Sequence, residues 1–298
     1  VISKLNICET HYLGLKNSKQ FYYWWRFESF INKYNPDIVH FVQCPLWSLI
    51  FKKKKFRSYI YHIHGGFFRN PMPKIQRFIW YWLNYRIDKF ISITNGAKRA
   101  VVDRKLVNPN KLTVVYNCID YDEMQLRYDK AEVKKILGLP PNSKILGSVG
   151  RVVSARGYSD LIRVVKILGD DWHGLIIGDG PDLERLKSLV QKLSVSSKIH
   201  FSGSVEDVRF YYSAMDAYGF FARYDSFGLA TAEAMASEVP VFGLRGAGEF
   251  SEPENPLLTE NNSVLIDRPD PENQWRIEND QTLISLANKI NIYFENGL

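Results

Sequence analysis

The sequence predicts an α/β protein made of two domains, each a parallel sheet with crossover helices. A chain of 298 residues is too long for one ordinary core, because a domain takes roughly 100 to 200 residues. Its content of 45% hydrophobic and 24% charged residues is typical of globular proteins. Short β-branched or aromatic runs alternate with longer helical patterns, and this alternation is typical of parallel sheets.

Four strands are predicted in the first half of the chain, at 37–41, 58–64, 90–93 and 112–115. A helix is predicted over 73–85, opened by Pro73, because apolar residues recur there at spacings of three and four. These residues form one apolar stripe on the expected helix: Ile75, Phe78, Ile79 and Trp82.

The second half repeats the pattern, and its predicted strands are 144–149, 174–177, 198–201, 217–221 and 239–242. The predicted helices are 158–168, 182–193, 206–215, 229–237 and one that starts at Thr282. The charged segment 120–143, which contains Pro140 and Pro141, is expected to link the two sets. We therefore expect domains at 1–125 and 126–298, each Rossmann-like.

Charge is distributed unevenly along the chain. Residues 1–120 hold 20 Lys and Arg against 6 Asp and Glu, whereas the remainder holds 19 against 26. The basic run from Lys52 to Arg57 and the aromatic run from Phe21 to Trp25 belong to this basic half. Such a surface can dock on anionic lipid, and a solvated loop tip is the alternative interpretation. Nucleic-acid binding is not expected, because no reader motif accompanies the charge.

Neither the cysteines nor the apolar runs predict a secreted or membrane-spanning protein. The three cysteines, Cys8, Cys44 and Cys118, have no metal-binding or redox spacing, which favours a reducing cytosol. The longest apolar run, 38–51, is interrupted by polar residues and is shorter than the roughly 20 residues that a span requires. The first ten residues lack the apolar stretch of a signal peptide. The expected location is the cytoplasm. If the basic half binds lipid, the protein is expected to be peripheral on the cytoplasmic face of the membrane.

A loop from Gly150 to Gly157 follows a predicted strand and opens a predicted helix. Free backbone N–H groups and the positive end of a helix dipole favour phosphate binding at such a place. Arg151 and Arg156 can add bidentate contacts to a diphosphate. A glycine turn with surface arginines is also common without any ligand, so both interpretations stay open from this segment alone.

Two more segments combine turn residues with acidic groups. The turn from Gly178 to Pro181 is interpreted as structural when taken alone, with Asp182 as a cap for the next helix. In the segment from Tyr224 to Ala236, Asp225 precedes an expected helix and Glu233 lies inside it. Glu233 can accept hydrogen bonds from a ribose diol while N–H groups at 228–230 face a phosphate. A capped helix with one surface glutamate is the simpler alternative.

In order and spacing, these segments resemble glycosyltransferase family 4, the large retaining family with the GT-B fold. The family's VGR-x4-KG loop, GDGP turn, HFxG element and E-x7-E segment resemble residues 149–157, 178–181, 198–203 and 225–236. Looser similarity covers the region from Pro36 to Asp120, including His64 before two glycines. The resemblance implies a GT-B fold, in which two Rossmann-like domains face a cleft.

The resemblance also implies roles for individual residues. Arg151 and Arg156 would hold the donor's diphosphate, Glu233 its ribose, and Asp225 the hydroxyls of the transferred sugar. His64 would face that sugar from the N-terminal domain, although a lone histidine at a strand end is also commonly structural. The expected donor-binding residues are Gly150, Gly178, Phe227, Gly228, Leu229 and Glu233, and no metal site is expected.

The implied reaction transfers a sugar from a UDP-sugar or GDP-sugar, with retention, to a polysaccharide, oligosaccharide or lipid-linked acceptor in cell-envelope polysaccharide, lipopolysaccharide or glycolipid synthesis. No cofactor is expected. Arg156 stands where lysine is usual, Asp225 where glutamate is usual, and Cys118 where a turn glycine is usual. The family's Gly-rich loop near the start and its final crossing helix are not found, so an incomplete N-terminal domain is expected. A catalytically impaired relative that binds nucleotide sugars is the alternative function, followed by an epimerase or phosphorylase.

Overall fold

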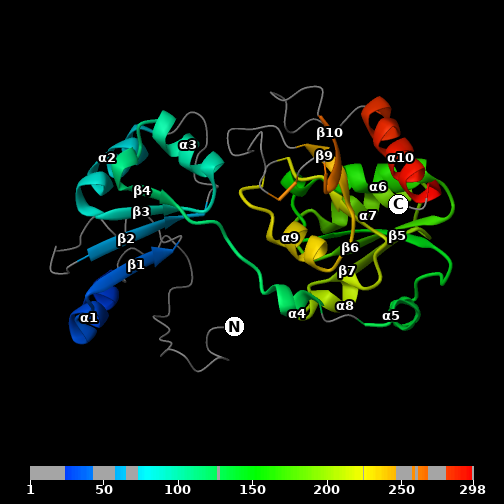
Figure 1. The fold of residues 1–298 in the computed structure, drawn as a ribbon, viewed down its shortest axis with the longest axis horizontal. Coiled ribbons are helices and arrows are strands. Elements are labelled where there is room, and N and C mark those ends of the chain that lie inside the picture. Colours follow the sequence, from blue (N-terminus) through cyan, green and yellow to red (C-terminus); the bar gives the residue numbers. More distant parts are fainter. Residues whose placement is uncertain are drawn as a thin grey trace. The chain divides into compact units, whose positions relative to one another are not determined.

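The computed structural model describes residues 24–42, 58–64, 73–125, 128–223, 225–245, 257–258, 261–267 and 280–296, with only the backbone at 24–28 and at 280. The chain divides into two compact units, residues 1–116 and 117–298 (Figure 1). The basic run at 52–57 and the aromatic residues at 21–23 lie outside the described residues.

The N-terminal unit is built on a parallel four-stranded sheet in the order β1-β2-β3-β4. Its strands are β1 (Ile38–Val42), β2 (Ser58–Ile63), β3 (Lys89–Ser92) and β4 (Leu112–Val114). Its helices are α1 (Trp24–Tyr34), α2 (Lys74–Arg86), α3 (Asn95–Asp103) and the 3-10 turn η4 (Pro109–Lys111). The four predicted strands are confirmed.

Helix α2 begins after Pro73, as predicted, but the expected apolar stripe is not its buried face. The residues that it buries are Trp80 and Leu83. The Trp80 ring lies 5.9 Å from that of Tyr61 on β2 and 6.4 Å from that of Phe90 on β3. Ile75 and Phe78 of the stripe are 67% and 63% exposed. The helical spacing predicted the helix correctly but did not identify its buried face, because large apolar residues occur on both sides of this helix.

The C-terminal unit is built on a parallel six-stranded sheet in the order β10-β9-β8-β5-β6-β7. Numbered within the unit, this is 3-2-1-4-5-6 read from β7, the strand order of dinucleotide-binding Rossmann folds. The strands are β5 (Lys144–Val149), β6 (Trp172–Ile177), β7 (Ile199–Gly203), β8 (Ala217–Phe220), β9 (Val241–Arg245) and β10 (Ser263–Asp267).

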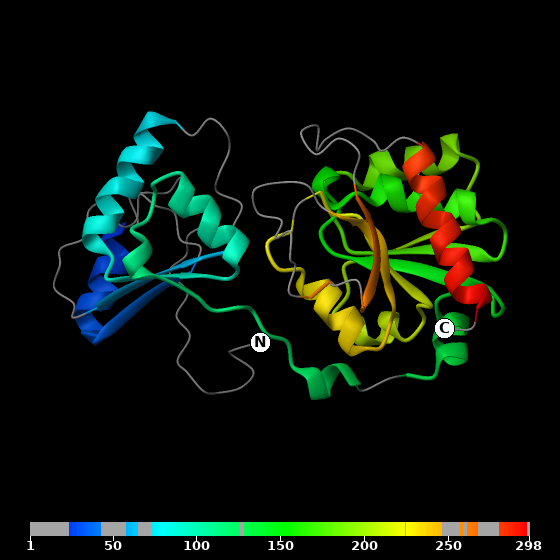
Figure 2. The same cartoon turned by 45° about the horizontal axis from the view of Figure 1, so that its top comes forward.

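Helices cover both faces of this sheet (Figure 2). They are α4 (Tyr121–Gln125), α5 (Lys130–Ile136), η5 (Ser154–Arg156), α6 (Tyr158–Leu168), α7 (Leu183–Lys192), α8 (Val208–Tyr212), α9 (Leu229–Ala236) and α10 (Asp280–Glu295). Side chains alternate along the strands, so Leu146 and Ile176 join the core under α6, α7 and α10. Ile145 and Leu175 join the other core, on the side of α5 and α9.

The segment 120–143 is not the expected linker, because half of it is helical and all of it belongs to the C-terminal unit. The Ser237 hydroxyl donates to the Met124 carbonyl over 3.4 Å, and Lys130 pairs with Asp216 at 2.7 Å. These contacts attach α4 and α5 to the body of the unit. The predicted helix at 206–215 is shorter than expected, since α8 spans Val208–Tyr212.

Candidate functional site

The site predicted from the sequence lies at the point where the strand order of the C-terminal sheet reverses. Strand β5 is the middle strand from which the chain proceeds first toward β7 and then, from β8, toward β10. The loops that leave the carboxyl ends of β5 and β8 therefore diverge, and ligands of open α/β sheets bind in the space between such loops. The loop after β5 carries Arg151 and Arg156, and the loop after β8 carries Asp225.

Close backbone contacts fix the loop after β5. Gly157 has φ +69°, and a Cβ atom there would lie 2.1 Å from the Phe221 carbonyl oxygen. Glycine is therefore required both for the left-handed backbone and for the approach of the two loops. The Arg223 N–H donates to the Ala155 carbonyl over 2.8 Å, and the Tyr158 hydroxyl donates to the Gly150 carbonyl over 2.9 Å.

The turn from Gly178 to Pro181 supports the arginine loop from the side of β6. Gly178 has φ +131°, and a Cβ atom there would lie 2.0 Å from the Gly150 carbonyl oxygen. The Val152 N–H donates to the Asp179 carbonyl over 2.9 Å. This agrees with the structural interpretation of the turn, and direct contact of Gly178 with a donor stays a prediction. The expected side-chain cap is wrong: Asp182 occupies the N-cap position without a cap hydrogen bond, and its carboxylate pairs with Arg185 at 3.1 Å.

Asp225 and Arg156, which the sequence places 69 residues apart, form an ion pair. The guanidinium Nη1 of Arg156 donates to Oδ2 of Asp225, while Oδ1 accepts from the Gly228 N–H over 3.1 Å. Burial of Arg156 favours its neutral form, but the charge and hydrogen bond of Asp225 outweigh burial and raise its pKa. Arg156 is therefore a fixed cation, and Arg151 lies exposed on the same loop.

Helix α9 supplies the other half of the site. Three N–H groups, at 228–230, were expected to face a phosphate. The Gly228 N–H donates to Asp225 instead, whereas the N–H groups of Leu229 and Ala230 lie in the first turn of α9. N–H groups of a first turn have no intrahelical acceptor and attract anions. Leu229 itself is 44% exposed at this end, and Phe227 is buried beneath the loop.

Glu233 lies half-buried inside α9, as the sequence predicted. Its Oε2 accepts from the Tyr212 hydroxyl over 3.0 Å, and the same hydroxyl lies 2.9 Å from the Ala230 carbonyl oxygen. Burial raises the pKa of Glu233, and the hydrogen bond from Tyr212 opposes that rise. The carboxylate is thus a positioned acceptor next to the helix end, a geometry suited to a diol.

A buried ion pair beneath these loops was not predicted. Nη2 of Arg223, which follows β8, lies 3.0 Å from Oδ2 of Asp160 in α6, and the two side chains are 3% and 0% exposed. An arginine at a strand end and an aspartate in the first turn of a helix are unremarkable in sequence, and only the fold joins them.

His64 belongs to the N-terminal unit and directly follows β2, at the strand end where it was predicted. Its ring lies 4.4 Å from that of His62, which stacks at 5.4 Å on His40. Burial, followed by the neighbouring imidazoles, lowers the pKa of His62 to about 4, and burial also lowers that of His64. His64 is therefore neutral near pH 7, and its role toward a donor sugar stays a prediction.

No group of three or more His, Cys, Asp and Glu side chains within the described ranges is arranged to hold a metal ion. Over the same ranges, no helix has the length and apolar character needed to cross a membrane.

Solved structures resemble this chain over most of its length. The structure of Anabaena HepE in complex with UDP has a TM-score of 0.75 at 17% identity, covering 92% of this chain and 73% of that one. A glycosyltransferase from Rickettsia africae ESF-5 has a TM-score of 0.72 at 19% identity, covering 99% of this chain and 77% of that one. Together with the two parallel sheets, these similarities establish the GT-B fold.

Family profiles match both units in turn. "Glycosyl transferases group 1" matches residues 129–274, and "Glycosyltransferase Family 4" matches residues 8–123. The chain belongs to glycosyltransferase family 4.

Among curated relatives, the lipopolysaccharide core biosynthesis mannosyltransferase LpsB of Rhizobium meliloti is 35% identical over 175 residues, covering 56% of this chain and 48% of the relative. N-acetyl-alpha-D-glucosaminyl L-malate synthase of Bacillus anthracis is 31% identical over 147 residues, covering 48% of this chain and 38% of the relative. The chain thus spans about half or less of the length of these relatives.

Proposed function

We propose that this protein transfers a sugar from a nucleoside diphosphate sugar to an acceptor hydroxyl, with retention at the anomeric carbon and without a metal ion. The observation that carries the proposal is the convergence of Arg156, Asp225 and the first turn of α9 at the switch point of one sheet. These groups provide a cation, a carboxylate and N–H donors where an α/β sheet binds its ligand.

The proposed mechanism acts on the leaving group. The bond between the anomeric carbon and the diphosphate oxygen breaks, and its electron pair goes to the diphosphate. Arg151, Arg156 and the α9 N–H groups stabilise the charge that develops there. Because the arginines neutralise this charge, a divalent ion is not required.

We propose retention because the chain belongs to a family identified as retaining, and the carboxylates of the site bear on the route by which retention is reached. The Asp225 carboxylate is engaged by Arg156 and by the Gly228 N–H, so we do not assign it as a nucleophile. The acceptor oxygen then attacks on the face that the diphosphate leaves, and its proton goes to the departing diphosphate. A neutral His64 can hydrogen-bond to a sugar hydroxyl in this scheme.

The relatives support a nucleotide-sugar donor and a cell-envelope product. HepE has been solved with UDP and with UDP-glucose, and LpsB is described as a lipopolysaccharide core mannosyltransferase. We therefore propose UDP-sugars and GDP-sugars as donors, and a polysaccharide, oligosaccharide or lipid-linked acceptor, used at the cytoplasmic side of the membrane.

Donor binding and catalysis are tested with Arg151→Ala. We expect the native chain to be stabilised in thermal-shift assays by UDP or GDP, because a ligand of the native state raises its stability. Turnover by Arg151→Ala should fall by about a hundredfold, since loss of one preorganised donor costs about 3 kcal/mol in the transition state. Arg185→Ala, which removes another half-exposed arginine of the same unit, is the matched control. Undiminished turnover by Arg151→Ala would refute the mechanism, and turnover abolished by EDTA would refute metal independence.

A nucleotide-sugar binding protein without turnover is the second candidate. The ion pair between Arg156 and Asp225 favours this candidate. The pair engages the guanidinium that would bind the donor's diphosphate and the carboxylate that would bind the donor's sugar. Calorimetry with UDP and GDP measures binding, and release of free sugar from the donor measures turnover. Binding without release over hours, with every acceptor class tried, would favour the binding protein.

A further inference from the structure

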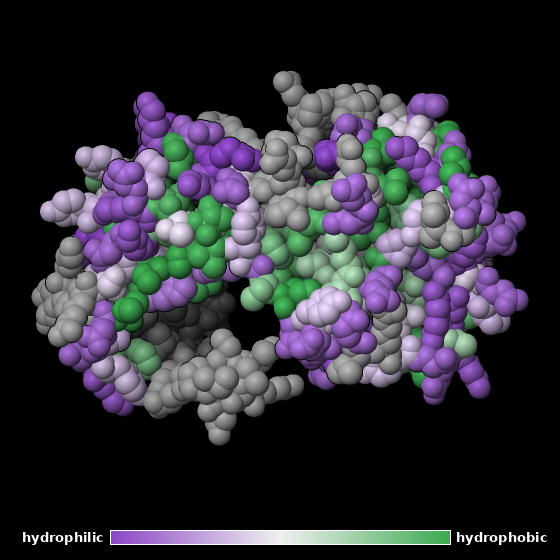
Figure 3. Space-filling view, in the orientation of Figure 1, coloured by the Kyte–Doolittle hydropathy of each residue, from purple (hydrophilic) through white to green (hydrophobic). Residues whose placement is uncertain are grey.

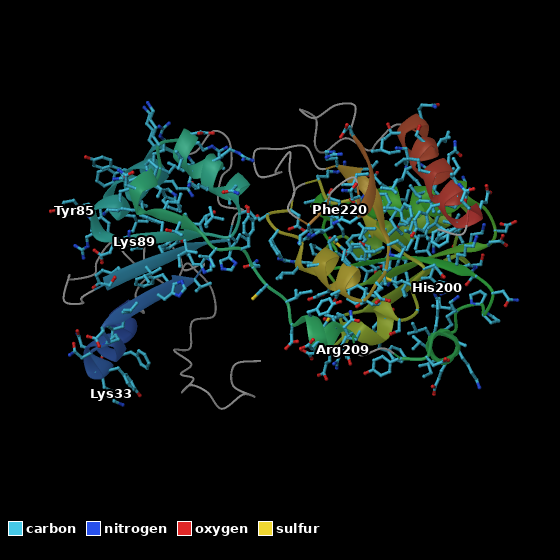
Figure 4. All side chains as sticks on the ribbon, in the orientation of Figure 1. Lys33, Tyr85, Lys89, His200, Arg209 and Phe220 are labelled. Carbon is cyan, nitrogen blue, oxygen red and sulfur yellow. The ribbon has the colours of Figure 1, made fainter. Side chains whose placement is uncertain are left out.

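The outward side of α2, in the N-terminal unit, carries an apolar and aromatic surface that is largely exposed. Its four most exposed members are spaced by three or four residues and lie on one side of the helix. They are Ile75 (67% exposed), Phe78 (63%), Tyr81 (77%) and Tyr85 (84%). We call these four residues the α2 outer face. Tyr85 lies on the outer side of the unit in Figure 4.

The opposite side of α2 is anchored, which fixes the direction of the outer face. Trp80 and Leu83 are fully buried against the sheet. At the end of the helix, Asn84 accepts from the Asn108 N–H over 2.7 Å, and Lys111 donates to the carbonyls of Asn84 and Ile87 over 2.6 and 2.9 Å. The helix cannot rotate its apolar residues inward without breaking these bonds, so their exposure is a property of the fold.

Basic side chains accompany the outer face. Lys74, Arg77 and Arg86 are in α2, and the helix contains no acidic residue. The Arg86 guanidinium lies 4.6 Å from the centre of the Trp82 ring, which combines a cation with an aromatic surface. In the space-filling view, apolar residues reach the surface of the N-terminal unit among hydrophilic ones (Figure 3).

We propose that the α2 outer face docks on a bilayer surface that contains anionic phospholipid. Tyrosine and tryptophan are enriched at the level of lipid headgroups, and lysine and arginine beside them attract anionic lipid. With 13 residues α2 is about 20 Å long, which is too short to span a bilayer and suits a helix that lies in the interface.

Charge argues for lipid rather than for a second copy of the chain. A symmetric dimer through this face would bring the cations of one α2 against the same cations of the other. Like charges in an interface are unfavourable, whereas an anionic surface complements them. The docking goes beyond the transferase reaction and is independent of it, although it would bring the N-terminal unit to a lipid-linked acceptor.

The proposal is tested by sedimentation of the 298-residue chain with vesicles of phosphatidylcholine alone and of phosphatidylcholine mixed with phosphatidylglycerol. We expect binding to the mixed vesicles that weakens as salt is added, because salt screens the attraction. Replacing all four residues of the outer face by serine should reduce the partition coefficient by about tenfold or more. Lys74→Glu combined with Arg77→Glu should remove the preference for phosphatidylglycerol.

A matched control uses residues of the C-terminal unit that are exposed to a similar degree. Tyr121 and Ile136 are 59% and 64% exposed, and Tyr121→Ser with Ile136→Ser should leave vesicle binding unchanged. Circular dichroism and sugar-nucleotide thermal shifts should be the same for all variants, which separates vesicle binding from failure of the fold or of the donor site. Equal vesicle binding by the parent and the four-serine variant, or none by the parent, would overturn the proposal. A dimer in sedimentation velocity that the four serines dissociate would do so too.

Discussion

The two units differ in the kind of side chain that each buries and the kind that each exposes. In the C-terminal unit, charged groups are buried and paired, as Asp160 and Arg223 are beneath the switch-point loops. In the N-terminal unit, apolar groups of α2 are exposed beside basic ones, as Phe78 and Tyr85 show. A site that stabilises developing charge needs fixed electrostatics, whereas a surface that meets another apolar phase needs accessible side chains.

Loss of the buried Asp160–Arg223 pair should have the largest effect on stability, and we expect that effect to be confined to the C-terminal unit. Arg223→Met leaves the Asp160 carboxylate buried without this partner, which costs about 3 to 5 kcal/mol. Hydrogen exchange of amides in β5 and β8 should accelerate by at least about a hundredfold where it reports global opening of the unit. Amides of β2 and β3 should exchange at the parent rate.

A double substitution separates the lost pair from lost packing. Asp160→Leu combined with Arg223→Met replaces both charges by apolar groups, so it should be more stable than Arg223→Met alone. If the double variant instead loses as much unfolding free energy as the two single variants added together, the two side chains are not coupled. The buried pair then does not stabilise the C-terminal unit as a pair.

The second largest effect is expected on turnover, from substitution of Arg156 in the C-terminal unit. It tests whether groups of this unit stabilise the charge that develops on the diphosphate. Arg156→Ala should lower kcat by about a hundredfold, or about 3 kcal/mol, because the diphosphate loses a fixed cation. Arg156→Lys, which keeps the charge without the planar fork, should lose less. Vesicle binding by both variants should equal that of the parent. A kcat of Arg156→Ala within twofold of the parent would show that Arg156 serves only to hold Asp225.

The sequence predicted the central elements of the C-terminal unit well, because their patterns are local. Strand β5 and helix α6 begin and end at the predicted residues, with glycines Gly150 and Gly157 between them. Strand β10 was missed because its short run follows a segment rich in prolines and acids. On α2, periodicity indicated a helix but could not indicate which of two apolar sides faces the sheet.

The candidate site was predicted as a set of residues but not as a set of contacts. Each residue was assigned to a ligand from its type and motif, so the pairing of Arg156 with Asp225 was unforeseen. Tyr212 was missed altogether because no motif includes it, although its hydroxyl holds Glu233. Contacts between residues distant in sequence depend on the fold, and only the strand order brings these groups to one edge.

A smaller effect is expected from Glu233, through pH. In the proposed donor complex the carboxylate form of Glu233 is the acceptor for the ribose hydroxyls, and burial raises the pKa of Glu233. As pH falls through this raised pKa, the group protonates and donor affinity should decline at a higher pH than for an ordinary glutamate. Glu233→Gln should bind a UDP-sugar or GDP-sugar about tenfold more weakly and without this pH dependence. Calorimetry over a pH series measures both, and Glu184→Gln in α7, whose side chain is 82% exposed, is the control. An unchanged pH dependence in Glu233→Gln would contradict the assignment.

The smallest effect is expected from Tyr212→Phe, which removes only the hydroxyl that holds Glu233. The unfolding free energy should fall by about 1 kcal/mol, the typical contribution of one hydrogen bond. Since the hydrogen bond from Tyr212 opposes the effect of burial, its loss should raise the pKa of Glu233 further. The pH at which donor affinity is half lost should therefore move upward, while affinity at alkaline pH stays near that of the parent. A shift in the opposite direction would mean that the hydroxyl stabilises the protonated carboxyl rather than the carboxylate of Glu233.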